Sequence, residues 1–173
     1  AVAHAARGDV LREQGNFEAA IDPYKAAISI APYEFSYHYR LGRVYQALDR
    51  DKEAAQVYEK TVDLNPDFAP AWINMGVVYF RLGDFVKARD DCERAVELAP
   101  THGYAWSNLG AVYDALGDSY RAITAYGALV NDTTMRGYHW WGKPLARFLD
   151  RSPTARWLIS PLESAAEASA TRL

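Results

Sequence analysis

Histidine and cysteine are the side chains of this sequence that could bind a metal ion or attack a substrate, and they are few. The histidines are His4, His38, His102 and His139, and no two of them have the close helical spacing of a metal site. No histidine or basic residue is placed to lower the pKa of the one cysteine, Cys92, so we expect a buried packing thiol. His4 and His38 stand where equivalent segments carry tryptophan, which indicates a packing role. These residues predict neither a metal site nor a nucleophile.

The other polar residues form no catalytic pattern either. Acidic residues are scattered, and we expect Asp90, Asp91 and Glu93 to be solvated. No glycine-rich loop that could hold a phosphate is present, and the glycosylation sequon at Asn131-Asp132-Thr133 matters only in a eukaryotic secretory pathway. We therefore predict a protein that is not an enzyme and needs no cofactor.

The elements that carry these residues recur with a period of 34 residues. Glycine recurs at Gly8, Gly42, Gly76 and Gly110. Alanine recurs at Ala20, Ala54, Ala88 and Ala122. Proline recurs at Pro32, Pro66 and Pro100, with Thr134 at the fourth position. This pattern predicts pairs of helices that cross closely where the small residues meet, and each proline ends the second helix. Between the helices, Gly15, Gly83 and Gly117 indicate left-handed caps, and Asp49 takes this position in the second repeat.

The segments WINMGVVY (72–79) and WSNLGAVY (106–113) carry the signature of a known family. They resemble the tetratricopeptide repeat, whose pattern includes W-x2-L-G-x2-Y, then A-x3-F, then P. The resemblance implies an all-α fold, a right-handed α-solenoid of four helix-turn-helix units at 1–34, 35–68, 69–102 and 103–136. We expect residues 137–173 to form helices that cap the last repeat.

In this family the first helices line a concave groove that binds peptides. Carrying the groove positions over to this sequence gives nine candidate site residues: Tyr39, Arg40, Arg43, Asn74, Phe80, Arg81, Tyr104, Asn108 and Asp114. Asparagine offers amide donors and acceptors to an extended backbone, and arginine favours a carboxylate or phosphate. The resemblance therefore implies a non-catalytic interaction module whose partner is a protein or peptide with an extended or helical segment, which could be acidic.

The two-carboxylate clamp of members that bind chaperone tails does not match this sequence. Its positions read Tyr39, Arg43, Asn74, Tyr104 and Asn108 when aligned from the second repeat, where the clamp requires lysine, asparagine and arginine. We therefore expect no binding of heat-shock chaperone tails. Two other readings stay open: these repeats could select substrates for a larger enzyme such as a glycosyltransferase, or they could form a self-assembling scaffold and hence an oligomer.

Composition limits the partners and the compartment. The net charge of −3 does not favour nucleic acid, and no apolar run is long enough to span a membrane. A single cysteine excludes an intramolecular disulfide and favours the cytoplasm, with the periplasm left open. The sequence begins at Ala1 without methionine and in register with the repeats, so earlier repeats or a targeting segment could precede it.

The charge changes sign near the end of the repeats. Residues 1–135 hold thirteen basic and nineteen acidic residues, whereas residues 136–173 hold six and three. Aromatic and aliphatic residues alternate with lysine and arginine over residues 140–159, which is typical of a cap with arginines facing outward. Membrane or partner contact through 140–159 is the alternative, which the short proline-bounded segments disfavour.

Overall fold

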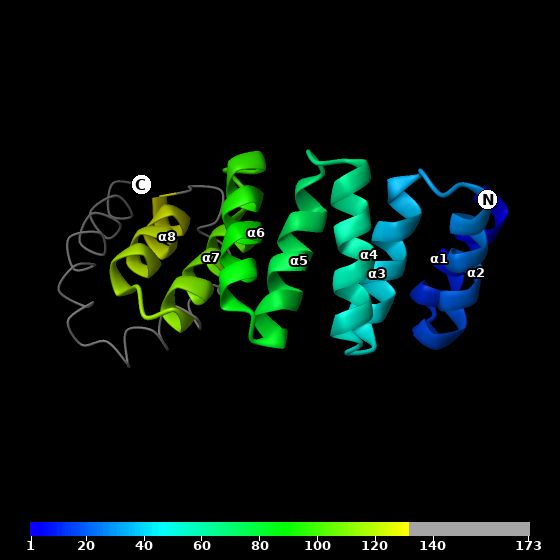
Figure 1. The fold of residues 1–173 in the computed structure, drawn as a ribbon, viewed down its shortest axis with the longest axis horizontal. Helices are drawn as coiled ribbons and strands as arrows, with labels where there is room; N and C mark the ends of the chain where they lie inside the picture. Colours follow the sequence, from blue (N-terminus) through cyan, green and yellow to red (C-terminus); the bar gives the residue numbers. More distant parts are fainter. Residues whose placement is uncertain (132–173) are drawn as a thin grey trace, which may run out of the picture. The chain divides into compact units, whose positions relative to one another are not determined.

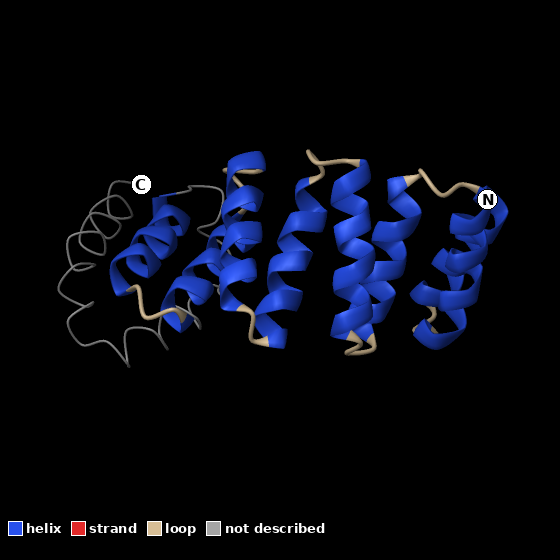
Figure 2. Ribbon diagram, in the orientation of Figure 1, coloured by secondary structure: helices blue, strands red, loops and turns tan. Residues whose placement is uncertain are grey.

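The computed structural model describes residues 1–131, which form eight helices with no strand among them (Figure 1, Figure 2). The helices are α1 (Val2–Glu13), α2 (Phe17–Ile30), α3 (Phe35–Ala47), α4 (Asp51–Leu64), α5 (Ala69–Leu82), α6 (Phe85–Leu98), α7 (Gly103–Ala115) and α8 (Ser119–Asn131). The prediction of an all-α chain of helix pairs is confirmed. The expected cap at 137–173, the segment 140–159 and the boundary after residue 136 lie outside the described residues.

The chain divides into two compact units, Ala1–Arg94 and Ala95–Leu173. In the first unit α1 packs against α2 and α3 against α4, and further contacts join α2 to α3 and α4 to α5. In the second unit α7 packs against α8. A helix pair of this size cannot bury its apolar face alone, and packing against the next pair completes its core. No helix within residues 1–131 combines the length and apolar character needed to cross a lipid bilayer.

Close crossing of the two helices in each pair explains the row of glycines. A Cβ atom added to Gly42 would lie 2.5 Å from the ring of Tyr58, which is completely buried. A Cβ atom added to Gly76 would lie 2.5 Å from Sγ of Cys92, which stands where the other repeats have tyrosine. A side chain at either glycine would push the helices apart.

The turn inside each pair reverses the chain through one residue with positive φ. Gly83 has φ 80° and closes α5 with a left-handed cap, as predicted. Asp49 has φ 56° and takes the same place after α3. Aspartate enters the left-handed region more readily than most residues because its short side chain can hydrogen-bond locally.

A ring nitrogen ties the start of each new pair to the proline that ends the previous one. The Trp72 indole N–H donates to the carbonyl oxygen of Pro66 at 2.8 Å, and the fourth repeat has the equivalent contact at 2.7 Å. In the second repeat the Nε2 atom of His38 lies 3.0 Å from the carbonyl oxygen of Pro32. Because a carbonyl only accepts, the proton of His38 is on Nε2. The packing role predicted for His38 is confirmed, since it is buried, but it is wrong for His4, which is exposed.

Each tyrosine near the end of a first helix is covered by a cation from the start of the second helix. The pairs are Tyr45 with Arg50, Tyr79 with Lys87 and Tyr113 with Arg121, at 4.8, 4.7 and 5.6 Å from the ring centroid. Arg50 precedes α4 by one residue, whereas Lys87 and Arg121 are the third residues of their helices. The cation is therefore supplied from two different positions.

Candidate functional site

The predicted site residues of the first unit lie on the first helices α3 and α5. Tyr39, Arg40 and Arg43 belong to α3, and Tyr39 and Arg43 share one side of it because they are four residues apart. Asn74, Phe80 and Arg81 belong to α5. Polar contacts connect α1 to α3 and α3 to α5, and we call the surface that carries them the first-helix face.

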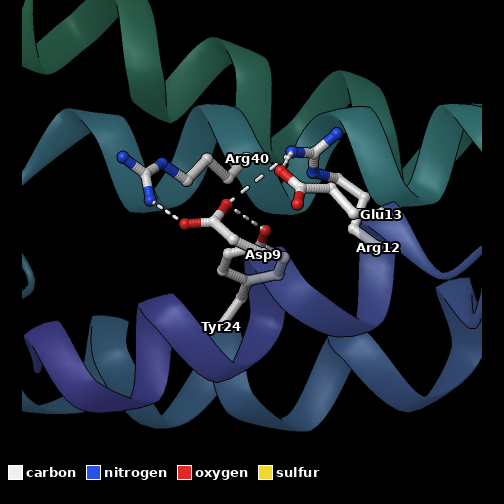
Figure 3. A network of polar contacts seen from close by, with 5 residues as sticks. All are labelled: Asp9, Arg12, Glu13, Tyr24 and Arg40. Carbon is white, nitrogen blue, oxygen red and sulfur yellow. Dashed lines mark hydrogen bonds and ion pairs between the residues drawn. The ribbon is translucent and has the colours of Figure 1, made fainter.

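Asp9 of α1 is the centre of the contact between α1 and α3 (Figure 3). Its Oδ1 atom accepts a hydrogen bond of 2.8 Å from the Tyr24 hydroxyl, and its Oδ2 atom pairs with the Arg40 guanidinium. Arg12 lies 3.9 Å from the same carboxylate. Burial and the bond to Asp9 raise the pKa of Tyr24 to about 12, so the phenol stays a donor. Arg40 is thus paired within the protein.

Asn74 of α5 bridges two tyrosines of the preceding repeat. Its Nδ2 atom lies 3.3 Å from the Tyr39 hydroxyl and 3.4 Å from the Tyr58 hydroxyl. The Tyr58 hydroxyl donates its proton to Oε1 of Gln46 at 2.9 Å, so its oxygen accepts from Asn74. The Tyr39 ring packs edge-on against Phe68 with centroids 4.9 Å apart. These contacts fix the orientation of the Asn74 amide, whose Oδ1 forms no hydrogen bond with the described residues.

Arg81 of α5 is also paired within the protein. Its guanidinium binds the carboxylate of Asp49 and, at 3.1 Å, Oδ2 of Asp51. The Oδ1 atom of Asp51 is buried without a hydrogen-bond partner, which leaves the Arg81 contact as the compensation for this carboxylate. Phe80 is half-buried and packs against Phe85 with ring centroids 5.3 Å apart, so it joins α5 to α6.

Arg43 differs from both other arginines. It is exposed, and it forms no ion pair or hydrogen bond with any other residue in the range 1–131. Its charge acts on Tyr58, whose pKa is raised by burial while Arg43 opposes the rise. Because Tyr58 contacts Asn74, Arg43 lies on the same part of the first-helix face as the Asn74 amide.

The remaining three predicted residues lie on α7 in the second unit. Tyr104 is about half exposed, and its ring centroid lies 6.0 Å from that of His102. Asn108 and Asp114 are half-buried.

Sequence reasoning left out three carboxylates that determine which arginines are free. Asp9, Asp49 and Asp51 were not among the nine candidates, yet they bind Arg40 and Arg81. One signal was available for Asp9, which stands one 34-residue period before Arg43 and so has the same register on its helix. The position of Asp49 in the turn gave no signal, because a cap residue usually has no role beyond the turn.

Histidine, cysteine and acidic side chains are the groups within residues 1–131 that could bind a metal ion or attack a substrate. Within residues 1–131 no three histidine, cysteine or acidic side chains are grouped to hold a metal ion. Cys92 is 1 % exposed, and burial raises the pKa of its thiol to about 12. The predicted packing role of Cys92 agrees with this burial. Asp91 corrects an expectation, because it is buried on the side of α6 that faces the protein and is not solvated.

Helix pairs that repeat every 34 residues and carry polar contacts across their first helices define a helical-repeat protein. Tetratricopeptide repeat models match residues 35–68, 69–102 and 92–124, and a TPR repeat model matches residues 8–49. The chain belongs to the tetratricopeptide repeat family. A comparison with curated protein sequences gives no match.

Solved structures of the same fold cover most of the chain. Two crystal structures of MamA have TM-scores of 0.78 and 0.81 at 23 % and 24 % identity, and each covers 96 % of this chain. The matches take in 97 % and 90 % of the MamA chains. The first TPR of Spaghetti (RPAP3), bound to the HSP90 peptide SRMEEVD, has a TM-score of 0.66 at 26 % identity. It covers 67 % of this chain and 92 % of its own.

Proposed function

We propose that this protein is a non-catalytic interaction module that binds a segment of a partner protein on the first-helix face. The observation that carries the proposal is the combination of a built polar surface and an uncommitted cation. Asp9–Arg40 and Tyr39–Asn74 contacts hold the first helices in register, and Arg43 is left exposed beside them. A partner segment would meet a surface whose side chains are already fixed, which lowers the entropic cost of binding.

The structures of similar fold support a peptide ligand. The first TPR of RPAP3 is bound to an HSP90 peptide, and the second TPR domain of human RPAP3 is in complex with the HSP70 peptide SGPTIEEVD. The second domain has a TM-score of 0.63 at 21 % identity and covers 65 % of this chain. A peptide on the first-helix face of this chain would find amide groups for its backbone and a guanidinium for an acidic side chain.

The test is the charge reversal Arg43→Glu in a pull-down from the source cell, read by mass spectrometry. We expect at least one captured protein to be lost, because the new carboxylate repels the acidic group that Arg43 would hold. Arg43 is the better target because reversing Arg40 would place a carboxylate against Asp9 and disturb the α1–α3 contact.

Lys60→Glu is the matched control, since Lys60 is an exposed cation on the second helix α4 of the same repeat. Helical content measured by circular dichroism should be the same in both variants. Capture that is identical in Arg43→Glu, Lys60→Glu and the wild type would refute the proposed use of this face.

A further inference from the structure

The charged side chains of the first-helix face largely neutralise one another. Arg40 is paired with Asp9, and Arg81 is paired with two carboxylates. Two of the three arginines predicted as anion-binding residues are thus opposed by three aspartates. Arg43 alone among these arginines has no partner in the part of the chain that the structure describes.

Asp9 is held in place and is not a mobile counter-ion. One of its oxygens accepts from the hydroxyl of Tyr24, a residue with 0 % exposure, while the other faces Arg40. A ligand carboxylate that approached Arg40 would have to displace an ion already fixed by a buried donor. The pairing therefore removes Arg40 from the groups available to a partner.

The pairing of Arg81 is equally specific. Its Nε atom binds Asp51, a carboxylate that is only 13 % exposed in its side chain and has no other compensation at its buried oxygen. Moving Arg81 towards a ligand would leave Asp51 buried and unpaired. The free-energy cost of this unpaired charge is larger than the stabilisation that an exposed ion pair with a ligand provides.

Arg43 and Asn74 remain as complementary groups. The Asn74 amide directs its Nδ2 atom towards Tyr39 and Tyr58, so its Oδ1 atom is left as an acceptor. Arg43 supplies donors on the same part of the face. An extended peptide has a backbone N–H for the acceptor and, at a neighbouring position, an acidic side chain for the guanidinium.

We infer that, if the first-helix face binds a partner as proposed above, it selects an extended segment with one acidic side chain at Arg43, and that a second acid adds no affinity. The partner class is thus a peptide with an isolated aspartate or glutamate. Tails with paired carboxylates, such as SRMEEVD, would find their second cation occupied.

Three synthetic libraries of random decapeptides test this selectivity. One contains no acidic residue, one contains a single glutamate, and one contains two glutamates separated by one residue. That separation puts the two side chains on one side of an extended peptide about 6–7 Å apart, close to the spacing of residues three apart on a helix such as Arg40 and Arg43. Capture by the immobilised full chain is quantified by mass spectrometry.

The wild type should enrich the one-acid library over the neutral library. It should enrich the two-acid library to the same extent as the one-acid library. Arg43→Gln should reduce the one-acid enrichment about tenfold, as the loss of a charge-assisted hydrogen bond does. Lys60→Gln is the matched control and should change nothing. A wild type that prefers two acids, or an Arg43→Gln variant that keeps the preference for one, would overturn the inference.

The substitution Asp9→Asn tests the inference in the opposite direction, because it should add binding of a second acidic side chain. Asparagine is isosteric and can still accept from Tyr24, but it no longer neutralises Arg40. This variant should enrich the two-acid library several-fold over the wild type, with unchanged circular dichroism. Unchanged capture of that library would refute the neutralisation of Arg40.

The two proposals fail in different ways. Library enrichment that does not depend on the number of acidic residues overturns the proposed selectivity. If Arg43→Glu still abolishes capture from the lysate in that case, the proposed interaction face stands. No capture from any library or from the lysate overturns both.

Discussion

Asp91 is a buried carboxylate on α6, and one of its two oxygen atoms has no hydrogen bond. It is 7 % exposed, and Oδ2 has no partner. Burial, followed by the nearby charges of Asp90 and Glu59, raises the pKa of Asp91 to about 7, while Lys87 opposes the rise. The ionised form is therefore disfavoured in the folded state.

This raised pKa predicts a pH dependence of stability. Below about pH 4 Asp91 is protonated in both states, and between its ordinary value of 3.8 and about 7 only the folded state keeps the proton. Since the folded state then binds more protons, the free energy of unfolding falls as pH rises through this window. Asp91→Asn should weaken this fall, measured by urea denaturation from pH 4 to pH 8. An Asp90→Asn control changes a more exposed neighbour, and an equal effect of both variants would contradict the role of burial.

Two positions at the start of each second helix carry opposite charges in the second and third repeats, and the order of the two charges is reversed between these repeats. Asp84 precedes α6 and accepts from the backbone N–H of Lys87 at 3.1 Å, while Lys87 covers Tyr79. The equivalent positions of the second repeat carry Arg50 and Glu53 in reversed order, and Arg50 covers the ring of Tyr45 without capping α4. The cation on the ring is kept, but the helix cap is lost.

Exchanging the two charges should therefore stabilise the second repeat. Arg50→Asp with Glu53→Lys would add a cap to α4, move one negative charge of its first turn to the N-cap and return a cation to Tyr45. The contact of Arg50 with Glu18, 3.5 Å long and exposed, is lost at little cost. We expect a higher Tm for the double variant than for the wild type by calorimetry. Arg50→Asp alone is the control and should gain less, because it places an acid beside Glu53; a double variant no better than this control would refute the exchange.

The elements were predictable from sequence because their signals are local. The glycine of each close crossing, the glycine or aspartate of each turn and the proline after the first three second helices recur every 34 residues and need no knowledge of distant contacts. His38 in a tryptophan position was placed in the same way. The ion pairs of the first-helix face were not predictable, because Asp9 and Arg40 are 31 residues apart and their pairing depends on how two helices pack. The sequence indicated three available arginines, whereas packing leaves Arg43.

At the scale of the whole molecule, stability should vary along the first unit. α1 buries only Ala5 and Gly8, whereas α3 buries six residues. In a repeat protein each pair contacts only its neighbours, so a helix with little buried surface opens at a lower free energy than the rest.

Hydrogen exchange measured by mass spectrometry should show this gradient. Backbone amides of α1 should exchange at least about tenfold faster than those of α3, which corresponds to about 1.4 kcal/mol of local stability. The comparison of α3 with α5, which also buries six residues, is the internal control and should show similar protection. Equal protection in α1 and α3 would mean that the Asp9–Arg40 contact joins the first pair to the second more strongly than burial indicates.

Cys92 fills, in the third repeat, the position that tyrosine fills in the other three, and its thiol is hidden between α5 and α6. An alkylating reagent can reach it only in molecules whose helices have separated at that point. When the helices close faster than the reagent reacts, the labelling rate gives the population of the open form; when they close more slowly, it gives the opening rate itself. Because the sequence has one cysteine, the native chain contains a single-site kinetic probe for the transient opening of one helix pair.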